Sequence, residues 1–140
     1  MRRRFVLFQL DQRTFAVEAE AVREVFPLPA ISPMDSPSPY VRGAVQLRGD
    51  ILPVLDLRPA LRIRPRPDQL HDVVLAVDLP GGAAGLIVEE LSDLSEVPDE
   101  EIHSTTGSPL TSASIASSGR IYPVLDLSQV SAELMGQPAA

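Results

Sequence analysis

Two aspartates stand in a segment that the chain carries twice. The sequence GDILPVLDL occupies residues 49–57 and GRIYPVLDL occupies 119–127, with seven of nine positions identical, so Asp56 and Asp126 are equivalent. Two related lobes that each supply one Asp could form a hydrolytic dyad, in which two carboxylates share one proton. Such a dyad needs each Asp on a tight turn. No glycine follows either Asp here, so an Asp that caps the end of a core strand is the favoured interpretation.

The other residue types that could do chemistry are few and scattered. His71 and His103 have no third ligand at metal-binding spacing, and the chain has no Cys. The Gly81-Gly82 pair predicts a hairpin turn. A phosphate-binding loop is not expected there, because such a loop needs a helix after it and none follows. The serines of 104–118 have no His placed to activate them. We therefore expect no catalytic residues, no metal and no cofactor.

Composition and charge exclude further classes of partner. The 140 residues carry a net charge of -7, which repels nucleic acid and anionic lipid. Arginines cluster only at 2–4 and 58–66, without interleaved aromatic residues, so we expect no nucleic-acid binding. The opening MRRRFVLFQLDQ has too short an apolar run for a signal peptide, and no stretch approaches the roughly 20 apolar residues of a membrane span. These features predict a cytoplasmic protein that does not insert into a membrane.

The spacing of prolines, glycines and β-branched residues predicts an all-β fold. The chain has 14 Pro and 8 Gly between short runs of Val, Ile and Leu, a pattern typical of short strands joined by turns. In the first half we expect strands at 4–10, 13–19, 20–26 (after one helical turn), 43–47 and 51–57, with turns at Asp11-Gln12 and 48–50 and a proline-rich loop at 27–39.

A second set of strands follows the charged, proline-rich linker 64–69. We expect strands at 72–79, 83–91, 94–98 and 120–127, no assigned strand in 104–118, and a terminal helix with Ser128 as N-cap and Gly136 after its last turn. The chain then forms a single domain, 1–140, with one lobe over roughly 10–64 and another over roughly 70–130, and it stays open whether the N-terminal strand crosses between them. The repeated segment is apolar on both faces, which predicts a strand buried on both sides, with Pro53 at a bend or an edge.

The run YVRGAVQLRGDILPVLDLRPAL, residues 40–61, resembles the CheW family of bacterial chemotaxis adaptors and the CheW-like regulatory domain of the partner kinase CheA. The family has a motif close to N-L-R-G-x-[IV]-x-P-[IV]-x-D-L, and only its Asn is replaced here, by Gln46. FVLFQLDQRTFAVEAEAVREV, VVLAVDL, AAGLIVEELSDLSEVPDEEI and GRIYPVLDL also resemble family segments in the same order. The likeness covers nearly the whole chain, although the strand before GRIYPVLDL is degenerate within SPLTSASIASSG.

This resemblance implies an all-β fold of two intertwined five-stranded barrels of the Src-homology-3-like type, with a short C-terminal helix. It implies a non-catalytic adaptor that joins the cytoplasmic tip of a chemoreceptor to a CheA-type histidine kinase, in the cytoplasm but recruited to membrane receptor arrays. In the family the receptor tip lies along the groove between the lobes. The regulatory domain of the kinase docks edge to edge on the first lobe.

The family motifs transfer two sets of binding residues to this chain. The set for the receptor is Val22, Glu24, Gly43, Arg48, Val73 and Gly85, and the set for the kinase is Ile31, Met34, Tyr40 and Val41.

Each set has a structural alternative. Arg48 could instead pair with a local carboxylate such as Asp50, while Ile31 and Tyr40 could close the mouth of the first lobe. Val22 and Val73 could belong to the core, and Glu24 could be solvated surface. Two other functions stay open at this point: a stand-alone regulator that binds a ligand in the groove, and a paired-Asp hydrolase.

Overall fold

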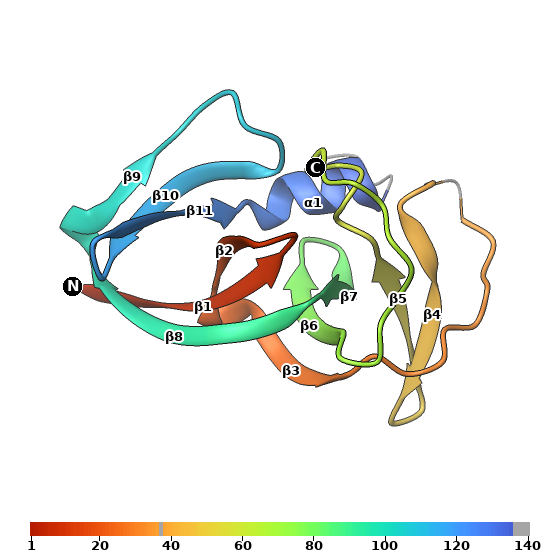
Figure 1. Cartoon of the computed structure of the whole chain (residues 1–140). Coiled ribbons are helices and arrows are strands. Elements are labelled where there is room, and N and C mark those ends of the chain that lie inside the picture. The colour runs from red at the N-terminus through yellow and green to blue at the C-terminus, as the bar shows by residue number, and fades with distance from the viewer. Residues whose placement is uncertain (37, 136–140) are drawn as a thin grey trace.

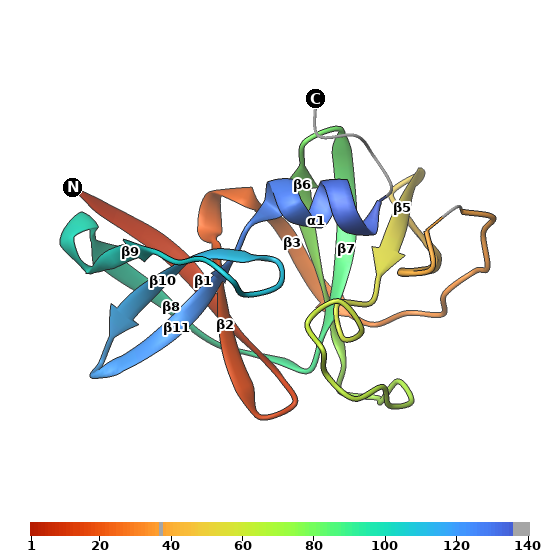
Figure 2. The same cartoon turned by 90° about the horizontal axis from the view of Figure 1, so that it is seen from above.

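Two β-sheets and one α-helix make up the chain in a computed structural model, which describes residues 1–36 and 38–135. Figures 1 and 2 show the sheets side by side, with helix α1 (Leu127–Leu134) next to the five-stranded one. The six-stranded sheet has the order β8 (Glu90–Pro98), β1 (Arg2–Leu10), β2 (Arg13–Glu18), β11 (Arg120–Leu125), β10 (Thr111–Ser117), β9 (Ile102–Ser104). The five-stranded sheet has the order β3 (Val22–Pro27), β6 (Val73–Leu79), β7 (Gly82–Val88), β5 (Asp50–Leu55), β4 (Val41–Leu47).

The N-terminal hairpin and the strand after it follow the sequence prediction. Asp11 and Gln12 have φ of 52° and 62°, the left-handed backbone of a type I′ turn, and they join β1 to β2. One 3₁₀ turn, η1 (Ala19–Ala21), then leads into β3, whose β-branched residues favour an extended strand. The prediction of a helical turn followed by a strand is confirmed.

The repeated segment is the second strand of a hairpin in each sheet. Ala44 lies opposite Pro53 in β4–β5, and Ser114 lies opposite Pro123 in β10–β11, which is 70 residues further along in both strands. Both hairpins turn on a pair of residues with positive φ, and both have one extra residue at the same place in their first strand. One structural unit is therefore used twice.

The N-terminal hairpin completes the second copy of this unit. Val54 of β5 pairs in parallel with Gly85 of β7, and Val124 of β11 pairs in the same way with Ala16 of β2. The order β3-β6-β7-β5-β4 is therefore repeated as β8-β1-β2-β11-β10, with β9 added at the end. We name β3–β7 the first barrel, and β1, β2 and β8–β11 the second barrel.

Two expectations about the lobes need correction. The expected boundary near 64–70 falls inside the first barrel, because β6 and β7 join β4 and β5 instead of opening the second lobe. The physical reason is that β5 pairs in parallel with β7, and parallel strands need a long crossover connection, which the chain after β5 supplies. The second barrel also has β9 as a sixth strand beside the five expected, and β10 (Thr111–Ser117) lies within the region 104–118 that had no assigned strand.

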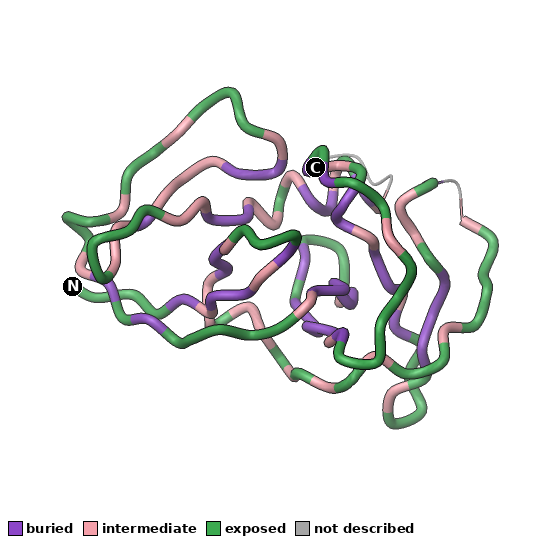
Figure 3. Tube along the Cα trace, in the orientation of Figure 1, coloured by how far each residue is buried: buried purple, intermediate pink, exposed green. Residues whose placement is uncertain are grey.

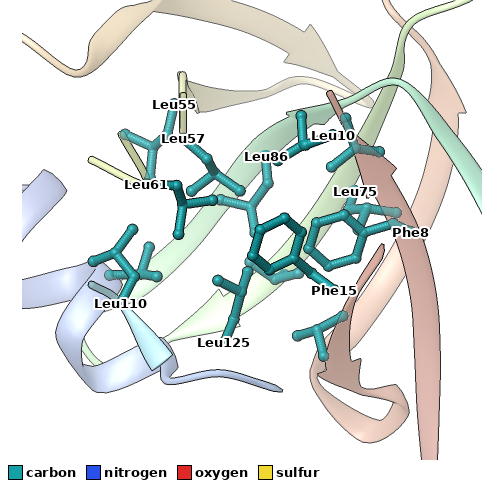
Figure 4. Packing of buried hydrophobic residues seen from close by; sticks show 14 of the residues in the cluster. Phe8, Leu10, Phe15, Leu55, Leu57, Leu61, Leu75, Leu86, Leu110 and Leu125 are labelled. Carbon is teal, nitrogen blue, oxygen red and sulfur yellow. The ribbon is translucent and has the colours of Figure 1, made fainter. Parts of the chain in front are cut away.

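Three buried clusters fill the fold. One lies inside the first barrel around Val54, one inside the second barrel around Val124, and the largest, which we name the shared core, lies between the barrels. Figure 3 shows buried positions along strands of both sheets, and Figure 4 shows side chains from both sheets meeting in the shared core. In β5, Val54 faces its own barrel while Leu55 faces the shared core. The prediction of a strand buried on both sides is confirmed for the end of β5, whereas Ile51 at its start is 68% exposed.

Pro53 is not on an edge strand, since β5 lies between β4 and β7. The pairing with β7 begins only at Val54, one residue later. The missing N–H of the proline therefore falls just before the two-sided part of the strand, where the sheet can tolerate it.

Asp56 and Asp126 cap the turns that follow the repeated strands. Asp126 accepts hydrogen bonds from the backbone N–H groups of Ser128 at 2.9 Å and Gln129 at 3.1 Å, and Asp56 accepts one from Arg58 at 3.0 Å. The capping interpretation is confirmed. The N-cap of α1 is Asp126 and not Ser128, because a carboxylate two residues earlier reaches the free N–H groups of the first turn. The expected Gly136 lies outside the described residues.

The charged linker is held across the first barrel by ion pairs. We name residues 58–72, which Figure 1 draws in yellow-green between β5 and β6, the strap. Arg66 donates hydrogen bonds to the Asp72 carboxylate at 3.0 and 2.6 Å. Asp68 accepts hydrogen bonds from Arg42 of β4 at 3.1 and 2.7 Å. The strap therefore connects the start of β6 to the outer strand β4.

Glu89, between β7 and β8, joins the strap to the second barrel. Its carboxylate accepts hydrogen bonds from the guanidinium of Arg58, whose side chain is only 8% exposed, and from the backbone N–H of Asp11 at 2.8 Å. Burial alone would raise the pKa of Glu89, but these donors and the charge of Arg66 hold it below the ordinary value. The pKa of Asp72 is lowered by the same balance, in which hydrogen bonds from Arg66 and a backbone N–H outweigh burial.

We predict that Leu86→Ala lowers the free energy of unfolding by about 2–5 kcal/mol, because Leu86 is fully buried in the shared core. Urea unfolding followed by circular dichroism should show one transition, since both barrels depend on that core. Ile51→Ala is the control: Ile51 is 68% exposed, and the change should stay within about 0.5 kcal/mol. Two separate transitions for Leu86→Ala, or equal costs for the two variants, would contradict the shared core.

We predict that Glu89→Gln flattens the loss of stability in acid. A carboxylate whose pKa falls on folding stabilises the native state above its unfolded pKa, about 4.3, and this contribution disappears as the pH drops through the folded pKa. Between about pH 5 and pH 3 the free energy of unfolding of Glu89→Gln should therefore change less than that of the unmodified protein. The exposed neighbour supplies the control, Glu90→Gln, which should keep the unmodified slope. Equal slopes for all three proteins would refute the prediction.

Candidate functional site

Two of the predicted receptor residues form an ion pair across the first barrel. Arg48, in the β4–β5 turn, donates hydrogen bonds to the carboxylate of Glu24 on β3, one of them at 2.9 Å, and these bonds raise the pKa of Arg48. Because β3 and β4 are the two ends of the sheet order, the pair shows that the sheet curls until its edges meet. The partner of Arg48 is therefore Glu24 and not Asp50.

A pocket of about 520 Å³ opens beside this ion pair. The Arg48 side chain is 74% exposed and the Glu24 side chain 25%, so the guanidinium is available to a partner while the carboxylate beneath holds it in place. A planar guanidinium held in this way can bind carboxylates or amide oxygens on a docked helix. The lining residues are Arg23, Glu24, Leu47, Arg48, Asp50, Ile51, Leu52, Ala76 and Ala83.

The two predicted receptor glycines are buried in the first barrel and do not line this pocket. Gly43 has a φ of +147°, and a Cβ there would lie 2.7 Å from Cγ2 of Ile31 and would overlap the carbonyl oxygen of Ser32. A Cβ on Gly85 would lie 2.7 Å from Cγ1 of Val74, inside the first barrel. Both glycines therefore allow close packing at these points, while a direct contact with a receptor stays a prediction.

The two predicted receptor valines lie at opposite ends of one strand pair. Val22 opens β3 opposite Val77, whereas Val73 opens β6 opposite Pro27. Both are half-buried and pack against the shared core. The structure therefore brings Glu24 and Arg48 together and spreads the other four predicted receptor residues through the same barrel.

The predicted kinase residues divide between two places. Ile31 packs on the core of the first barrel, as the alternative of a residue closing the barrel mouth anticipates, whereas Tyr40 and Val41 pack against the shared core. Met34, 42% exposed, is the accessible member of the set. Two backbone hydrogen bonds of 2.8 Å between Ser32 and Ala44 hold the loop against β4 at Ser32.

Sequence reasoning missed the residues that flank these sets. Leu70, 97% exposed, lines a pocket of about 530 Å³ together with Ile31 and Arg42, and its signal was an isolated leucine among charged and proline residues. Arg58 and Glu89 hold the strap, and no sequence motif pointed to either residue. Ion pairs between distant segments leave no pattern of spacing.

Two further properties of the described part of the chain bear on its chemistry. Within residues 1–36 and 38–135, no three His, Cys, Asp or Glu side chains gather as a possible metal site. In the same ranges, no helix is long and apolar enough to span a bilayer. Asp56 and Asp126 follow strands of different sheets and serve as caps, so the geometry gives a paired-Asp mechanism no support.

We predict that Gly43→Ala detaches the proline-rich loop from β4. The new methyl group would overlap the Ser32 carbonyl, so amide hydrogen exchange at Ser32 and Ala44 should speed up, with a cost of about 1–3 kcal/mol in stability. Gly49→Ala is the control, because a Cβ there meets nothing within 4 Å. It should leave exchange at those two amides unchanged, and unchanged exchange in Gly43→Ala would disprove the proposed clash.

Comparisons with known proteins agree with this architecture. The family model described as the CheW-like domain matches residues 4–135. "Chemotaxis protein CheW" of Rhizobium meliloti (strain 1021) and "Probable chemotaxis protein CheW" of Rhizobium etli are each 29% identical over 103 residues, which cover 74% of this chain and 66% of the relative. About a third of the length of each relative therefore lies outside the match.

The fold is also found in a solved structure. The "scaffolding protein TtCheW from Thermoanaerobacter tengcongensis" superposes with a TM-score of 0.83 at 22% identity, covering 91% of this chain and 90% of that one. At this identity the likeness shows the shared fold of two β-sheets with a short C-terminal helix. Since the family model extends over nearly the whole sequence, this chain belongs to the CheW-like domain family.

Proposed function

We propose that this protein is a non-catalytic adaptor that couples chemoreceptors to a CheA-type histidine kinase. The observation that carries the proposal is the match of the CheW-like domain model to residues 4–135, with the family motif placed on the exposed Arg48 turn. Relatives bearing the names of chemotaxis proteins support the same pathway. An adaptor works by holding two partners at once, so it needs two separate surfaces and no reactive groups.

The receptor surface in this proposal is centred on Arg48. Its guanidinium is exposed and hydrogen-bonded to Glu24, so a partner helix would meet a charge that a carboxylate already orients. The pocket beside it adds the apolar side chains of Leu47 and Ile51 to the contact. Loss of Arg48 should therefore reduce affinity for a receptor without disturbing either barrel core.

The kinase surface in this proposal is the proline-rich loop with the strand beside it. Met34 offers an exposed apolar side chain, and Ile31 of the same loop packs on the core of the first barrel. Exposed apolar residues on a rigid loop are typical of protein interfaces. Through this second surface the adaptor would pass the state of the receptor to the kinase, in an array beneath the membrane.

We predict that Arg48→Ala and Met34→Glu separate the two binding functions. Arg48→Ala should weaken binding to the cytoplasmic fragment of the cognate receptor by about tenfold or more, and should leave affinity for the regulatory domain of the kinase within about twofold. Met34→Glu should do the opposite, because it places a charge in an apolar contact. Biolayer interferometry with both purified partners measures all four affinities.

Each variant is the control for the other, and both replace exposed side chains, so thermal unfolding should stay close to that of the unmodified protein. If one variant weakened binding to both partners equally, the proposal of two separate surfaces would be wrong. Failure of the unmodified protein to bind either partner would remove the adaptor function itself.

A further inference from the structure

Part of the strap lies on the first barrel without a buried side chain to hold it. The strap starts with an apolar stretch, in which Leu61 and Ile63 belong to the shared core. It ends at Asp72, which is buried. Residues 64–71 between these points are all described, and none of them is buried. We name this segment, 64–71, the flap. The hydrophobic effect therefore contributes little to its attachment.

Charged groups hold the flap instead. Arg66 donates two hydrogen bonds to the Asp72 carboxylate, and its Nε lies 3.7 Å from Oε2 of Glu89. Asp68 accepts two hydrogen bonds from Arg42 of β4. The side chains of this second pair are 38% and 32% exposed, so water and salt reach them. Ion pairs this accessible to solvent are individually weak.

The barrel groups that hold the flap have other partners that stay behind when it lifts. Arg42 Nη1 also lies 3.9 Å from Oδ2 of Asp56, and Glu89 keeps its hydrogen bond from Arg58. Asp72 loses its hydrogen bonds from the flap, but it keeps the nearby charge of Arg58 and gains access to water. Lifting the flap therefore leaves none of these described charges both buried and uncompensated, which is the costly outcome for a charged group.

We propose that the flap opens as a unit, with the salt-sensitive ion pairs as its latch, while both barrels and the apolar start of the strap stay folded. The opening is a local equilibrium whose free energy lies below that of global unfolding. Asp68, Gln69 and Leu70 form one wall of the pocket that Ile31 also lines, so opening removes that wall. A consequence for kinase binding at Ile31 rests on the function proposed above, whereas the flap itself does not.

Hydrogen exchange followed by NMR on the full chain at pH 7 tests the proposal. Lifting the flap breaks the bonds from the Gln69 N–H to the Asp72 carboxylate, 2.8 Å, and from the Asp72 N–H to the Gln69 carbonyl, 3.0 Å. Raising sodium chloride from about 0.01 M to about 1 M shortens the screening length from about 30 Å to about 3 Å. Exchange at these two flap amides should then rise about three- to tenfold. The amides of Leu61 and Ile63, and that of Leu28, which bonds to the Asp72 carbonyl, should not change.

Three variants decide whether the ion pairs are the latch. Asp68→Asn removes the charge that pairs with β4 and should speed exchange at the two flap amides about three- to tenfold in low salt. Arg66→Gln removes the other link and should speed it about tenfold or more. Asp78→Asn is the matched control, because it breaks an exposed ion pair with Arg23 at the far end of β6. It should leave exchange at the flap amides unchanged.

Urea separates local opening from global unfolding. Below about 1 M urea, exchange at the flap amides should depend little on urea, because opening exposes little apolar surface, whereas exchange at Leu86 in the shared core should follow global unfolding. The proposal is overturned if the flap amides share the urea dependence of Leu86, or if neither salt nor Asp68→Asn speeds their exchange. Equal acceleration at Leu61 and Ile63, or an equal effect of Asp78→Asn, would overturn it as well. None of these results depends on whether the chain binds a receptor or a kinase.

Discussion

Each sheet of this protein has two apolar faces, and water must be excluded from both. One face of each sheet closes on itself as a barrel, and the other can be buried only against the second sheet, in the core built around Phe8, Phe15, Leu55 and Leu86. The two barrels therefore cannot separate without exposing fully buried side chains from both. Helix α1 belongs to the same constraint, since its buried Val130 and Leu134 complete that core.

The repeat supplies a common frame, and the departures from it supply the proposed functions. Both copies share the parallel pairing and the bulge, which are backbone features, and the Asp whose carboxylate caps the following turn. The side chains around them differ. Where the first barrel joins its edges through Glu24 and Arg48, the second joins β8 to β10 through Ser95 and Ser117, whose hydroxyl oxygens are 2.7 Å apart. The β4–β5 turn of the first barrel has Arg48 where the β10–β11 turn has Ser118, so the proposed receptor surface belongs to the first barrel.

The part of the candidate site that lies in a family motif could be predicted from the sequence. Arg48 was found by its motif, and the structure adds that Glu24, 24 residues earlier, is its partner. Asp50 is close in sequence but does not pair with Arg48, because closure of the barrel brings β3 next to the β4–β5 turn. Residue spacing near Arg48 carries no information about this long-range contact. The family motif predicted receptor contact for Gly85, but Gly85 lies inside the barrel. Its position depends on how β7 pairs with β5 and β6, which decides the residues of β7 that face inward. Glu89 and Arg58 had no motif, because a buried ion pair joins segments whose approach the tertiary fold alone creates.

The amino-acid sequence by itself determined the local structure: the turn at Asp11-Gln12, the strand after one helical turn and the Asp that caps the end of each repeated strand. These features depend on neighbours within a few residues, on φ preferences, alternation and short side chains that bond nearby N–H groups. Only the tertiary structure decided that β6 and β7 complete the first barrel while the N-terminal hairpin completes the second. Parallel pairing joins strands that are distant in sequence. Of the possible pairings, the fold adopts the one that buries the apolar residues on both faces of the two sheets.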